Sequence, residues 1–544
     1  MGFRSRSESA RQGQARENTG RRVGQHSNTA SGNKNTHRGR QSASQRSTGY
    51  QQRRPTERQK KFRAHGSGDK ARDVALAVLR EVTENDAFAN LVLPTHIKQA
   101  GLKGRDAAFC TEITYGCLRA TGLIDAIISK AAGRPVEKID SMVLDILRLG
   151  AYQILRTRVD DHAAVNTSVE LAKAHGAGQA SGFVNGVLRT ITRSTPQQWA
   201  ETVAGGDNMA DIALRNAHPA WIARAFNDSL SYASRAETTN QAGDDGATPA
   251  GGDVIHDELS ACLAADDARP IVHLAARPGQ ISAEELALVT GGEEGKLSPY
   301  CVYLEDGSPG DLDAVREGMA SVQDEGSQLI ALSLVNTPLH REDSGRWLDL
   351  CAGPGGKTAF IASWALGENA RVDAVELAEH RARLVENTTR NLPVSVHVGD
   401  GRAPRSIPGL DVPAEGYDRV LVDAPCSGLG ALRRRPEARW RKTAADVAPL
   451  SALQKELLRS AVDITAQGGI VIYSTCSPHL SETVDVVRSI SAQTGAEIVD
   501  LSTNFPHLKH NDAAPFIQLW PHRHGTDAMF IAGLRPARHS SVSR

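Results

Sequence analysis

The sequence lacks the features expected of a membrane protein, a secreted protein or a metal-binding protein. Its seven cysteines are odd in number and contain no CxxC pair, so neither a zinc site nor a disulfide framework is indicated. No apolar run approaches the roughly 18 residues of a membrane span, and the first residues contain no apolar signal core. We therefore expect a reduced, cytoplasmic protein with no membrane segment and no bound metal.

Net charge is also absent, because 63 Lys and Arg balance 63 Asp and Glu. The balance hides an asymmetry: residues 1–63 carry sixteen basic and three acidic side chains, a charge of +13, so the remainder carries −13. This segment is nearly free of aliphatic residues and cannot bury a core, so we expect a disordered basic tail over residues 1–68. Its charge favours an arm that holds RNA phosphates, and the alternative is a solubilising tail without a specific partner.

One stretch with three closely spaced glycines, LDLCAGPGGKT at residues 348–358, carries the first motif. The apolar residues before it predict a short buried strand, and the alanines and isoleucine after it recur at helical spacing. A strand, a glycine loop and a helix form the nucleotide-binding turn of an open α/β sheet. The glycine order is neither GxGxxG nor GxxxxGK[ST], which disfavours a dinucleotide or phosphate-clamp site. A tight strand-to-helix turn without a ligand is the alternative.

Two further stretches each place a cysteine directly after an apolar run. DAPCSGLG covers residues 423–430 and contains Cys426, and YSTCSP covers residues 473–478 and contains Cys476. Both cysteines therefore lie at the carboxyl ends of predicted strands, the edge at which doubly wound sheets bind ligands. Two cysteines at one edge, beside a glycine loop, indicate thiol chemistry on a bound substrate.

Together these motifs resemble those of the Nop/Sun (Fmu-type) RNA 5-methylcytosine methyltransferases, and the resemblance extends over about residues 70–535. It implies S-adenosylmethionine as cofactor and a Rossmann-like class I methyltransferase domain. It also implies that Cys476 is the nucleophile and that Cys426 acts in product release. DNA cytosine methyltransferases use a Pro-Cys cysteine as nucleophile, so the appearance of the motif alone favours Cys426. Asp423 is expected to contact the N3 and N4 edge of cytosine or the methionine end of the cofactor.

The expected cofactor site combines the glycine loop with acids at strand ends. Glu376 lies 20 residues beyond Gly356 and suits ribose hydroxyls, and Asp400 ends the next predicted strand and suits the adenine amino group. Solvated strand-end acids are the alternative. The full set of expected cofactor contacts is Cys351, Ala352, Gly353, Pro354, Gly355, Gly356, Lys357, Glu376, Asp400 and Asp423.

The spacing of apolar residues divides the rest of the chain into helical and mixed segments. From Lys70 to Arg193 the apolar spacing is helical, and residues 163–176 and 183–189 resemble the NusB-type RNA-binding domain. Short strand-like pieces then resemble a small α/β RNA-binding subdomain. The expected organisation is a basic tail at 1–68, an all-α NusB-like domain at 69–195, a linker helix and flexible insertion at 196–253, the α/β subdomain at 254–340, the methyltransferase domain at 341–536 and a tail at 537–544.

A basic run follows the Pro-Cys loop and is expected to contact RNA phosphates, with a solvated helix face as the alternative. It comprises Arg433, Arg434, Arg435, Arg439, Arg441 and Lys442.

The resulting expectation is a monomeric enzyme that methylates carbon 5 of a cytosine in 16S rRNA. One alternative is a tRNA methyltransferase, which the NusB-like segments disfavour. Another is a non-enzymatic NusB-like RNA-binding factor, which needs neither a glycine loop nor a thiol nucleophile. The identity of the target nucleotide depends on RNA shape and register.

Deleting residues 1–63 is expected to weaken RNA binding and to flatten its salt dependence, because those residues supply the excess positive charge. The methylated position should not change, since phosphate contacts position the RNA without specifying sequence. Filter binding across a salt series measures both effects. An unchanged salt slope would show that the tail takes no part in RNA binding.

Overall fold

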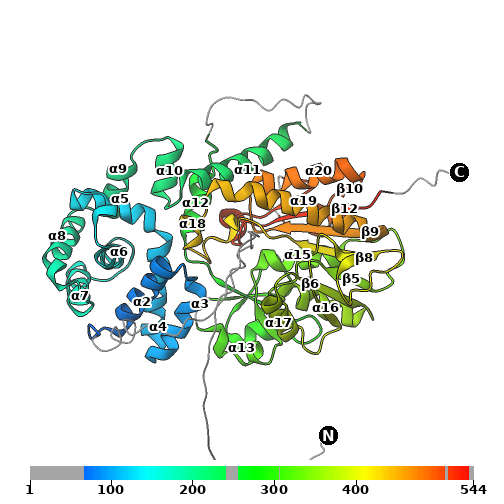
Figure 1. Ribbon diagram of the computed structural model, residues 1–544, viewed down its shortest axis with the longest axis horizontal. Helices are drawn as coiled ribbons and strands as arrows, with labels where there is room; N and C mark the ends of the chain where they lie inside the picture. The colour runs from blue at the N-terminus through cyan, green and yellow to red at the C-terminus, as the bar shows by residue number, and fades with distance from the viewer. Residues whose placement is uncertain (1–65, 240–254, 306, 509–512, 538–544) are drawn as a thin grey trace, which may run out of the picture. The chain divides into compact units, whose positions relative to one another are not determined.

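A computed structural model describes residues 66–239, 255–305, 307–508 and 513–537 (Figure 1). The predicted basic tail up to residue 65, most of the predicted insertion and the last seven residues lie outside this described part.

The N-terminal domain is all-helical, as the apolar spacing predicts. Up to Ile191 the described residues form seven α-helices around one apolar core, which also contains Cys110 and Cys117. Asp69, Asp140 and Asp160 cap three of the helices by accepting hydrogen bonds from first-turn N–H groups. The helices are α2 (Lys70–Asn85), α3 (Ala89–Ala100), α4 (Gly104–Arg119), α5 (Thr121–Ala132), α6 (Ser141–Arg156), α7 (Asp161–Ala174) and α8 (Ser181–Ile191).

Four helices and a small sheet follow. The helices are α9 (Pro196–Ala204), α10 (Met209–Arg215), α11 (Ala220–Thr239) and α12 (Leu259–Asp267). The small sheet has the order β2-β3-β1-β4, with antiparallel pairs throughout. Its elements are β1 (Val272–Ala276), α13 (Ala283–Thr290), β2 (Glu293–Glu294), β3 (Cys301–Leu304), α14 (Asp313–Arg316) and β4 (Ala320–Val322). Helix α15 (Glu325–Asn336) leads from this sheet into the next domain.

The second sheet is the scaffold of the C-terminal domain. It has the order β10-β12-β9-β8-β5-β6-β7, and β11 pairs with β12. Neighbouring strands from β7 to β9 are parallel, whereas β12 runs antiparallel to β9. The strands are β5 (Arg346–Asp349), β6 (Arg371–Glu376), β7 (Val394–Val398), β8 (Tyr417–Asp423), β9 (Thr465–Thr475), β10 (Glu497–Val499), β11 (Ile517–Gln518) and β12 (Phe530–Arg535). The helices are α16 (Gly356–Gly367), α17 (Glu379–Thr388), α18 (Ala438–Arg441), α19 (Val447–Asp463), α20 (Val484–Thr494) and α21 (Pro521–His524).

Helices cover both faces of this sheet, so its central strands are apolar on both sides (Figure 1). In β8, Val420 and Val422 pack in the core that contains Leu458 of α19, and Leu421 packs in the core that contains Phe360 of α16. The expected fold class, a NusB-like helical domain followed by α/β parts with a Rossmann-like sheet, is confirmed.

The basic run after the Pro-Cys loop is largely buried. Arg433 donates to the Asp527 carboxylate at 2.7 Å, and Arg434 donates to Asp324 at 2.7 Å. Asp324 caps α15 and also lies 3.3 Å from Nδ1 of His273 in the small sheet. These ion pairs join the Pro-Cys loop to the small sheet and to the segment before β12.

Arg439 and its neighbours reach the helical parts. Fully buried Arg439 donates to Asp266 at 2.8 Å and to the carbonyl of Ala217 at 3.1 Å. The Trp440 indole N–H donates to the carbonyl of Arg119 at 3.0 Å. Arg441 donates to backbone carbonyls of the helical domain as well.

The predicted phosphate contact is therefore wrong for Arg433 and Arg439, whose side chains are buried. It stays a prediction for Arg434 and Arg441, which are partly exposed. The charges of all four are already used by carboxylates and carbonyls within the chain. The run forms short turns rather than one exposed helix face, so successive side chains point to different parts of the fold. Arg435 differs, because its side chain is exposed and has no hydrogen-bond partner within the described residues.

Arg439→Ala is expected to lower the free energy of unfolding by about 3–5 kcal/mol, because Asp266 would stay buried without its guanidinium partner. Arg435→Ala is the matched control and should change stability by less than about 0.5 kcal/mol. Urea denaturation followed by tryptophan fluorescence compares the two. Equal effects would show that the buried pair does not stabilise the fold.

Candidate active site

The order of the parallel strands reverses between β5 and β8, which lie side by side in the sheet. Loops that leave such neighbours in opposite directions open a crevice at the carboxyl ends of the strands, where ligands bind. The glycine loop follows β5, the Pro-Cys loop follows β8, and the second cysteine loop follows β9, the next strand along. The sheet therefore brings all three predicted motifs to one edge.

The glycines of the loop are required by two close approaches. A Cβ atom built on Gly353 would lie 2.2 Å from Oε2 of Glu376. Gly355 has a φ of 110°, in the left-handed region that favours glycine, and its Cβ would lie 3.0 Å from the Cα of Val385. The loop thus packs tightly against the ends of β6 and α17 and leads directly into the first turn of α16.

The two predicted strand-end acids have different surroundings. Glu376 is buried at the end of β6, accepts a hydrogen bond from Gly353 N at 3.1 Å and lies 3.4 Å from the Arg381 guanidinium. Asp400 follows β7 at the surface, where hydrogen bonds from Arg402 hold the pKa of its carboxyl below the ordinary value. The structure thus brings Glu376 to the glycine loop and pairs Asp400 with Arg402.

Gln323 contributes a buried acceptor beside the same loop. A Cβ atom on Gly356 would lie 4.0 Å from Cδ of Gln323, and within the described residues Oε1 of Gln323 has no hydrogen-bond partner. A buried acceptor without a donor costs about 1–3 kcal/mol. A ligand with an N–H group at the glycine loop would remove that cost.

The two predicted cysteines face each other. Sγ of Cys426 lies 3.4 Å from Sγ of Cys476, and both thiols are partly buried. The hydrogen bond from Cys426, with the charges of Lys357 and Arg435, holds the pKa of Cys476 below its ordinary value in spite of burial. The same hydrogen bond, together with burial and the charge of Glu482, raises the pKa of Cys426 well above its ordinary value. The surroundings of Cys476 therefore favour its thiolate, and those of Cys426 favour its thiol.

Lys357 and Asp423 form an ion pair between the glycine loop and the Pro-Cys loop. Nζ of Lys357 lies 2.8 Å from the Asp423 carboxylate, which also accepts from the Ser474 hydroxyl at 2.9 Å. Burial opposes the charge of Lys357, but the charge and hydrogen bond of Asp423 outweigh it and raise the pKa of the ammonium group. A positive charge is thereby fixed close to the Cys476 thiol.

Buried Glu482 joins the two cysteine loops and is absent from the sequence-based set. Its carboxylate accepts from the backbone N–H of Ser427 at 2.7 Å and from the hydroxyl of Ser477 at 2.7 Å. It also accepts from the Ser427 hydroxyl. These serines directly follow Cys426 and Cys476, so one carboxylate fixes both loops. In the sequence, the role of Glu482 is indicated locally only by the serine that follows each cysteine. That indication can be interpreted only once the two cysteine loops are known to be adjacent.

Asp349, the last residue of β5, is a second buried acid that the sequence-based set omits. Burial raises the pKa of its carboxyl to about 6, although Thr358 donates a hydrogen bond at 2.7 Å. Its position at a strand end directly before the glycine loop is a signal that the sequence already contained.

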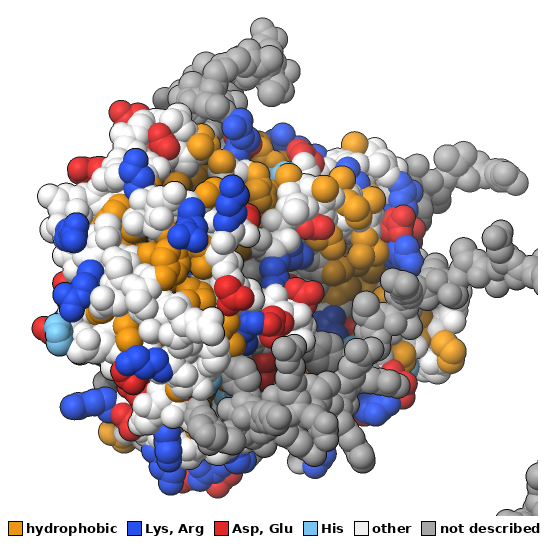
Figure 2. Space-filling model, turned by 60° about the vertical axis from the view of Figure 1, so that its left-hand side comes forward, with side chains coloured by type: hydrophobic (Ala, Val, Ile, Leu, Met, Phe, Trp, Pro, Cys, Tyr) orange, Lys and Arg blue, Asp and Glu red, His pale blue; other side chains and the backbone are white. Residues whose placement is uncertain are grey.

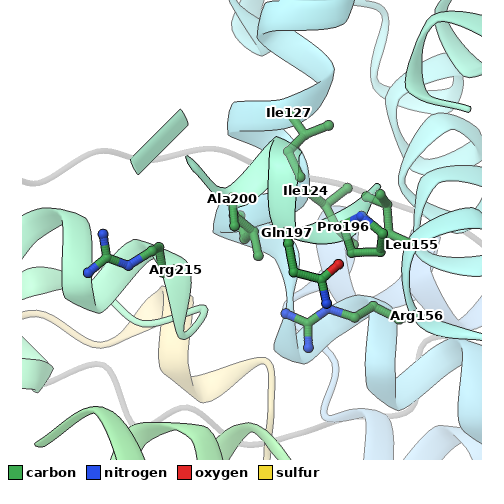
Figure 3. A pocket seen from close by; sticks show the side chains of 9 residues that line it. Ile124, Ile127, Leu155, Arg156, Pro196, Gln197, Ala200 and Arg215 are labelled. Carbon is green, nitrogen blue, oxygen red and sulfur yellow. The ribbon is translucent and has the colours of Figure 1, made fainter. Parts of the chain in front are cut away.

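A hollow in the helical part of the chain is separate from this chemistry. It has a volume of about 420 Å³, is lined by apolar side chains of α5, α6 and α9, and carries Arg156 and Arg215 at its edge (Figure 3). It contains none of the predicted site residues. We therefore place the candidate active site at the carboxyl edge of the large sheet.

Comparison with known proteins assigns families to the two main parts of the chain. Residues 336–535 match the family model "16S rRNA methyltransferase RsmB/F", and residues 69–193 match the NusB family model. The Mycobacterium tuberculosis protein Rv1407 is 51% identical over 86% of this chain and 96% of its own length. The ribosomal RNA small subunit methyltransferase B of Klebsiella pneumoniae strain 342 is 31% identical over 86% of this chain and 98% of its own.

The chain belongs to the RsmB/F family of 16S rRNA methyltransferases. As an RsmB/F-family enzyme it uses S-adenosylmethionine, the cofactor that the resemblance of its motifs implies. The crystal structure of PH0851 shares the fold, with a TM-score of 0.64 at 20% identity over 86% of this chain and 98% of that one.

The residues at the glycine loop fit this cofactor. Gln323 Oε1 is an unpaired acceptor suited to an ammonium group, and the backbone of Gly353 and Gly355 allows close approach. Within the described ranges, no helix is long and apolar enough to cross a membrane. The same ranges contain no group of three or more His, Cys, Asp or Glu arranged to hold a metal ion.

Asp349→Asn is expected to stabilise the RsmB/F-family chain increasingly as the pH rises. The folded pKa of Asp349, about 6, lies above the ordinary value of 3.8, so the stability that its neutral form provides is lost between about pH 4 and pH 6. Asparagine cannot titrate, so the difference in unfolding free energy should move by about 2.5 kcal/mol in favour of the variant between pH 4 and pH 7. Urea denaturation at each pH measures it. A constant difference would show that Asp349 does not titrate in this range.

Proposed function

We propose that this enzyme methylates carbon 5 of a cytosine in 16S rRNA, with Cys476 as the nucleophile and Cys426 as the thiol that permits release. The observation that carries the proposal is the pair of facing thiols, 3.4 Å apart, beside the glycine loop. Methyl transfer to an oxygen or an exocyclic nitrogen needs no thiol nucleophile, whereas carbon 5 of cytosine is too weak a nucleophile to react unaided.

The Cys476 thiolate adds to carbon 6 and forms an S–C6 bond. The electrons of the C5=C6 bond move into the ring, so carbon 5 becomes enamine-like and takes the methyl group. S-adenosylmethionine supplies that group as an electrophile. The lowered pKa of Cys476 and the nearby Lys357 ammonium support the first step, because the thiolate is the attacking species.

Release requires loss of the carbon 5 proton. In the free enzyme, the hydrogen bond to Cys476 is the largest cause that raises the pKa of Cys426. Once Cys476 is bonded to carbon 6 its thiolate charge is gone, so Cys426 gives its proton to solvent more readily, and the resulting Cys426 thiolate accepts the carbon 5 proton. The C5=C6 bond then forms again, the S–C6 bond breaks, and Cys476 leaves as a thiolate.

Asp423 and Lys357 serve as the polar contacts of the ring. Asp423 is the last residue of β8, two residues before Pro425, and its carboxylate lies between Lys357 and Ser474. From this position it is suited to the N3 and N4 edge of cytosine, with Lys357 balancing its charge. Glu376 and Asp400 are assigned to the ribose and to the adenine amino group.

The RNA substrate is engaged through dispersed contacts. On the face shown in Figure 2, Lys and Arg side chains are scattered among acidic and apolar ones rather than gathered in one patch. The NusB-like domain, the exposed Arg435 and the basic residues 1–63 are the candidates for phosphate contact.

Bisulfite sequencing of rRNA and tRNA from a deletion strain tests the substrate. The expected result is one cytosine of 16S rRNA that loses its protection and regains it when the wild-type gene is returned. Loss of protection in tRNA alone would favour the tRNA alternative.

The two cysteine variants are expected to fail differently. Cys476→Ala should abolish methylation, because no adduct forms at carbon 6. Cys426→Ala should allow attack and methyl transfer but stall release, which leaves enzyme covalently bound to RNA. A denaturing gel with labelled RNA and cofactor should show a slowly migrating band for Cys426→Ala.

The double variant Cys426→Ala, Cys476→Ala is the control and should show no such band. A band with Cys476→Ala instead would reverse the two roles and make the Pro-Cys residue the nucleophile. Activity in both single variants, with no trapped RNA, would contradict the thiol mechanism.

A further inference from the structure

Glu482 lies where no step of the proposed reaction needs a carboxylate, yet it is completely buried. An unpaired buried carboxylate is strongly unfavourable, so its hydrogen bonds must hold it in place. Its donors are the Ser427 backbone N–H, the hydroxyls of Ser427 and Ser477, and the side-chain amide of Gln454 at 3.2 Å. None of these groups belongs to the glycine loop or to the predicted cofactor contacts.

The contacts tie Glu482 to the residue after each reactive cysteine. Ser427 and Ser477 also lie 3.1 Å apart through their hydroxyl oxygens. Gln454 of α19 donates a second hydrogen bond to the carbonyl of Pro425 at 2.9 Å, so the other side of Cys426 is fixed as well. The backbone on both sides of Cys426 is thereby anchored to one carboxylate and its partner amide.

We propose that Glu482 is a positioning residue that sets the separation of the two thiols and places a fixed negative charge on the Cys426 side of the pair. The asymmetry follows from its contacts, since Ser427 supplies two of the hydrogen bonds and Ser477 supplies one. The negative charge disfavours a second anion at Cys426. Cys476 instead faces the cations Lys357 and Arg435, and its ionisation is favoured.

The charged and titratable groups around each thiol agree with this assignment. Cys426 faces Cys476 and Glu482. The Tyr473 hydroxyl lies on the same side and donates to the Glu482 carbonyl at 2.7 Å. Cys476 faces Cys426, the Lys357 and Arg435 cations, and the Asp423 carboxylate. Replacing Glu482 therefore removes a charge that acts on one thiol more than on the other.

Thiol alkylation of the full-length enzyme, without RNA or cofactor, tests the proposal. Iodoacetamide modification is followed from pH 6 to pH 10, and peptide mass spectrometry gives the rate at each cysteine separately. In the wild type, the rate at Cys476 should rise at a lower pH than the rate at Cys426. Because methyl transfer is not involved, this test and the proposed function can fail independently.

Glu482→Gln keeps the size of the side chain and removes its charge. The pH midpoint for alkylation of Cys426 should fall, so that it lies closer to the midpoint of Cys476. If Glu482 only supported the fold, its replacement would not shift the midpoint of one cysteine relative to that of the other. In methylation assays, kcat should fall with little change in KM, because Glu482 contacts neither RNA nor cofactor. A folded Glu482→Gln protein with both midpoints unchanged would overturn the proposal.

Ser477→Ala is a second variant that tests the positioning role even if Glu482→Gln does not fold. It retains the charge but releases the Cys476 loop, so the thiols should separate and the midpoint of Cys476 should rise. Unchanged midpoints in Ser477→Ala would overturn the positioning role.

Glu325→Gln is the matched control. Glu325 is also a buried carboxylate, and it accepts from the N–H groups of Leu297 and Ser298 and from the Tyr303 hydroxyl, all in the small α/β part. It should leave both alkylation midpoints as they are in the wild type. A shift in Glu325→Gln equal to that in Glu482→Gln would show a general effect of buried charge and would overturn the assignment.

Discussion

Buried guanidinium groups hold the loop that carries Cys426 to the rest of the chain. Arg433 and Arg434 tie it to Asp527 and Asp324, and Arg439 ties it to Asp266. Breaking a buried ion pair costs about 3–5 kcal/mol, because one charge is left without compensation. The small sheet, the linker helices and the large sheet therefore fix the position of the Pro-Cys loop together. The other parts of the site, the glycine loop and the Cys476 loop, lie next to this loop.

The thiols show how unequal surroundings create unequal chemistry. Two identical side chains lie 3.4 Å apart, yet Cys476 is drawn towards the thiolate and Cys426 towards the thiol. The largest cause of the difference is the hydrogen bond between the two thiols, and the charges of Lys357 beside Cys476 and of Glu482 beside Cys426 act in the same direction. In the reaction we propose, such a pair supplies a nucleophile first and a proton acceptor afterwards.

The sequence was sufficient wherever the signal is local or follows from strand order. Apolar runs predicted β5, β8 and β9, and the strand-end rule for doubly wound sheets predicted that the two cysteines meet. It was insufficient wherever the partner lies far along the chain. Arg439 was predicted to contact RNA phosphates, because its actual partner Asp266 precedes it by 173 residues. The role of Glu482 can be recognised only when the two cysteine loops are seen to be adjacent. The raised pKa of Asp349 results from burial, which the sequence does not give. The domain limits and the catalytic roles of the site residues remain predictions.

The indole of Trp440 rests on Gly122 at the start of α5, and a Cβ atom there would lie 2.1 Å from the ring. Any larger residue at position 122 would displace the tryptophan, so these two sites are constrained to change together in evolution. A free-standing NusB-like protein has no reason to keep a glycine at this point. A chimera that joined such a domain to this C-terminal domain would therefore have a steric clash at the contact with Trp440, even if each domain kept its own fold.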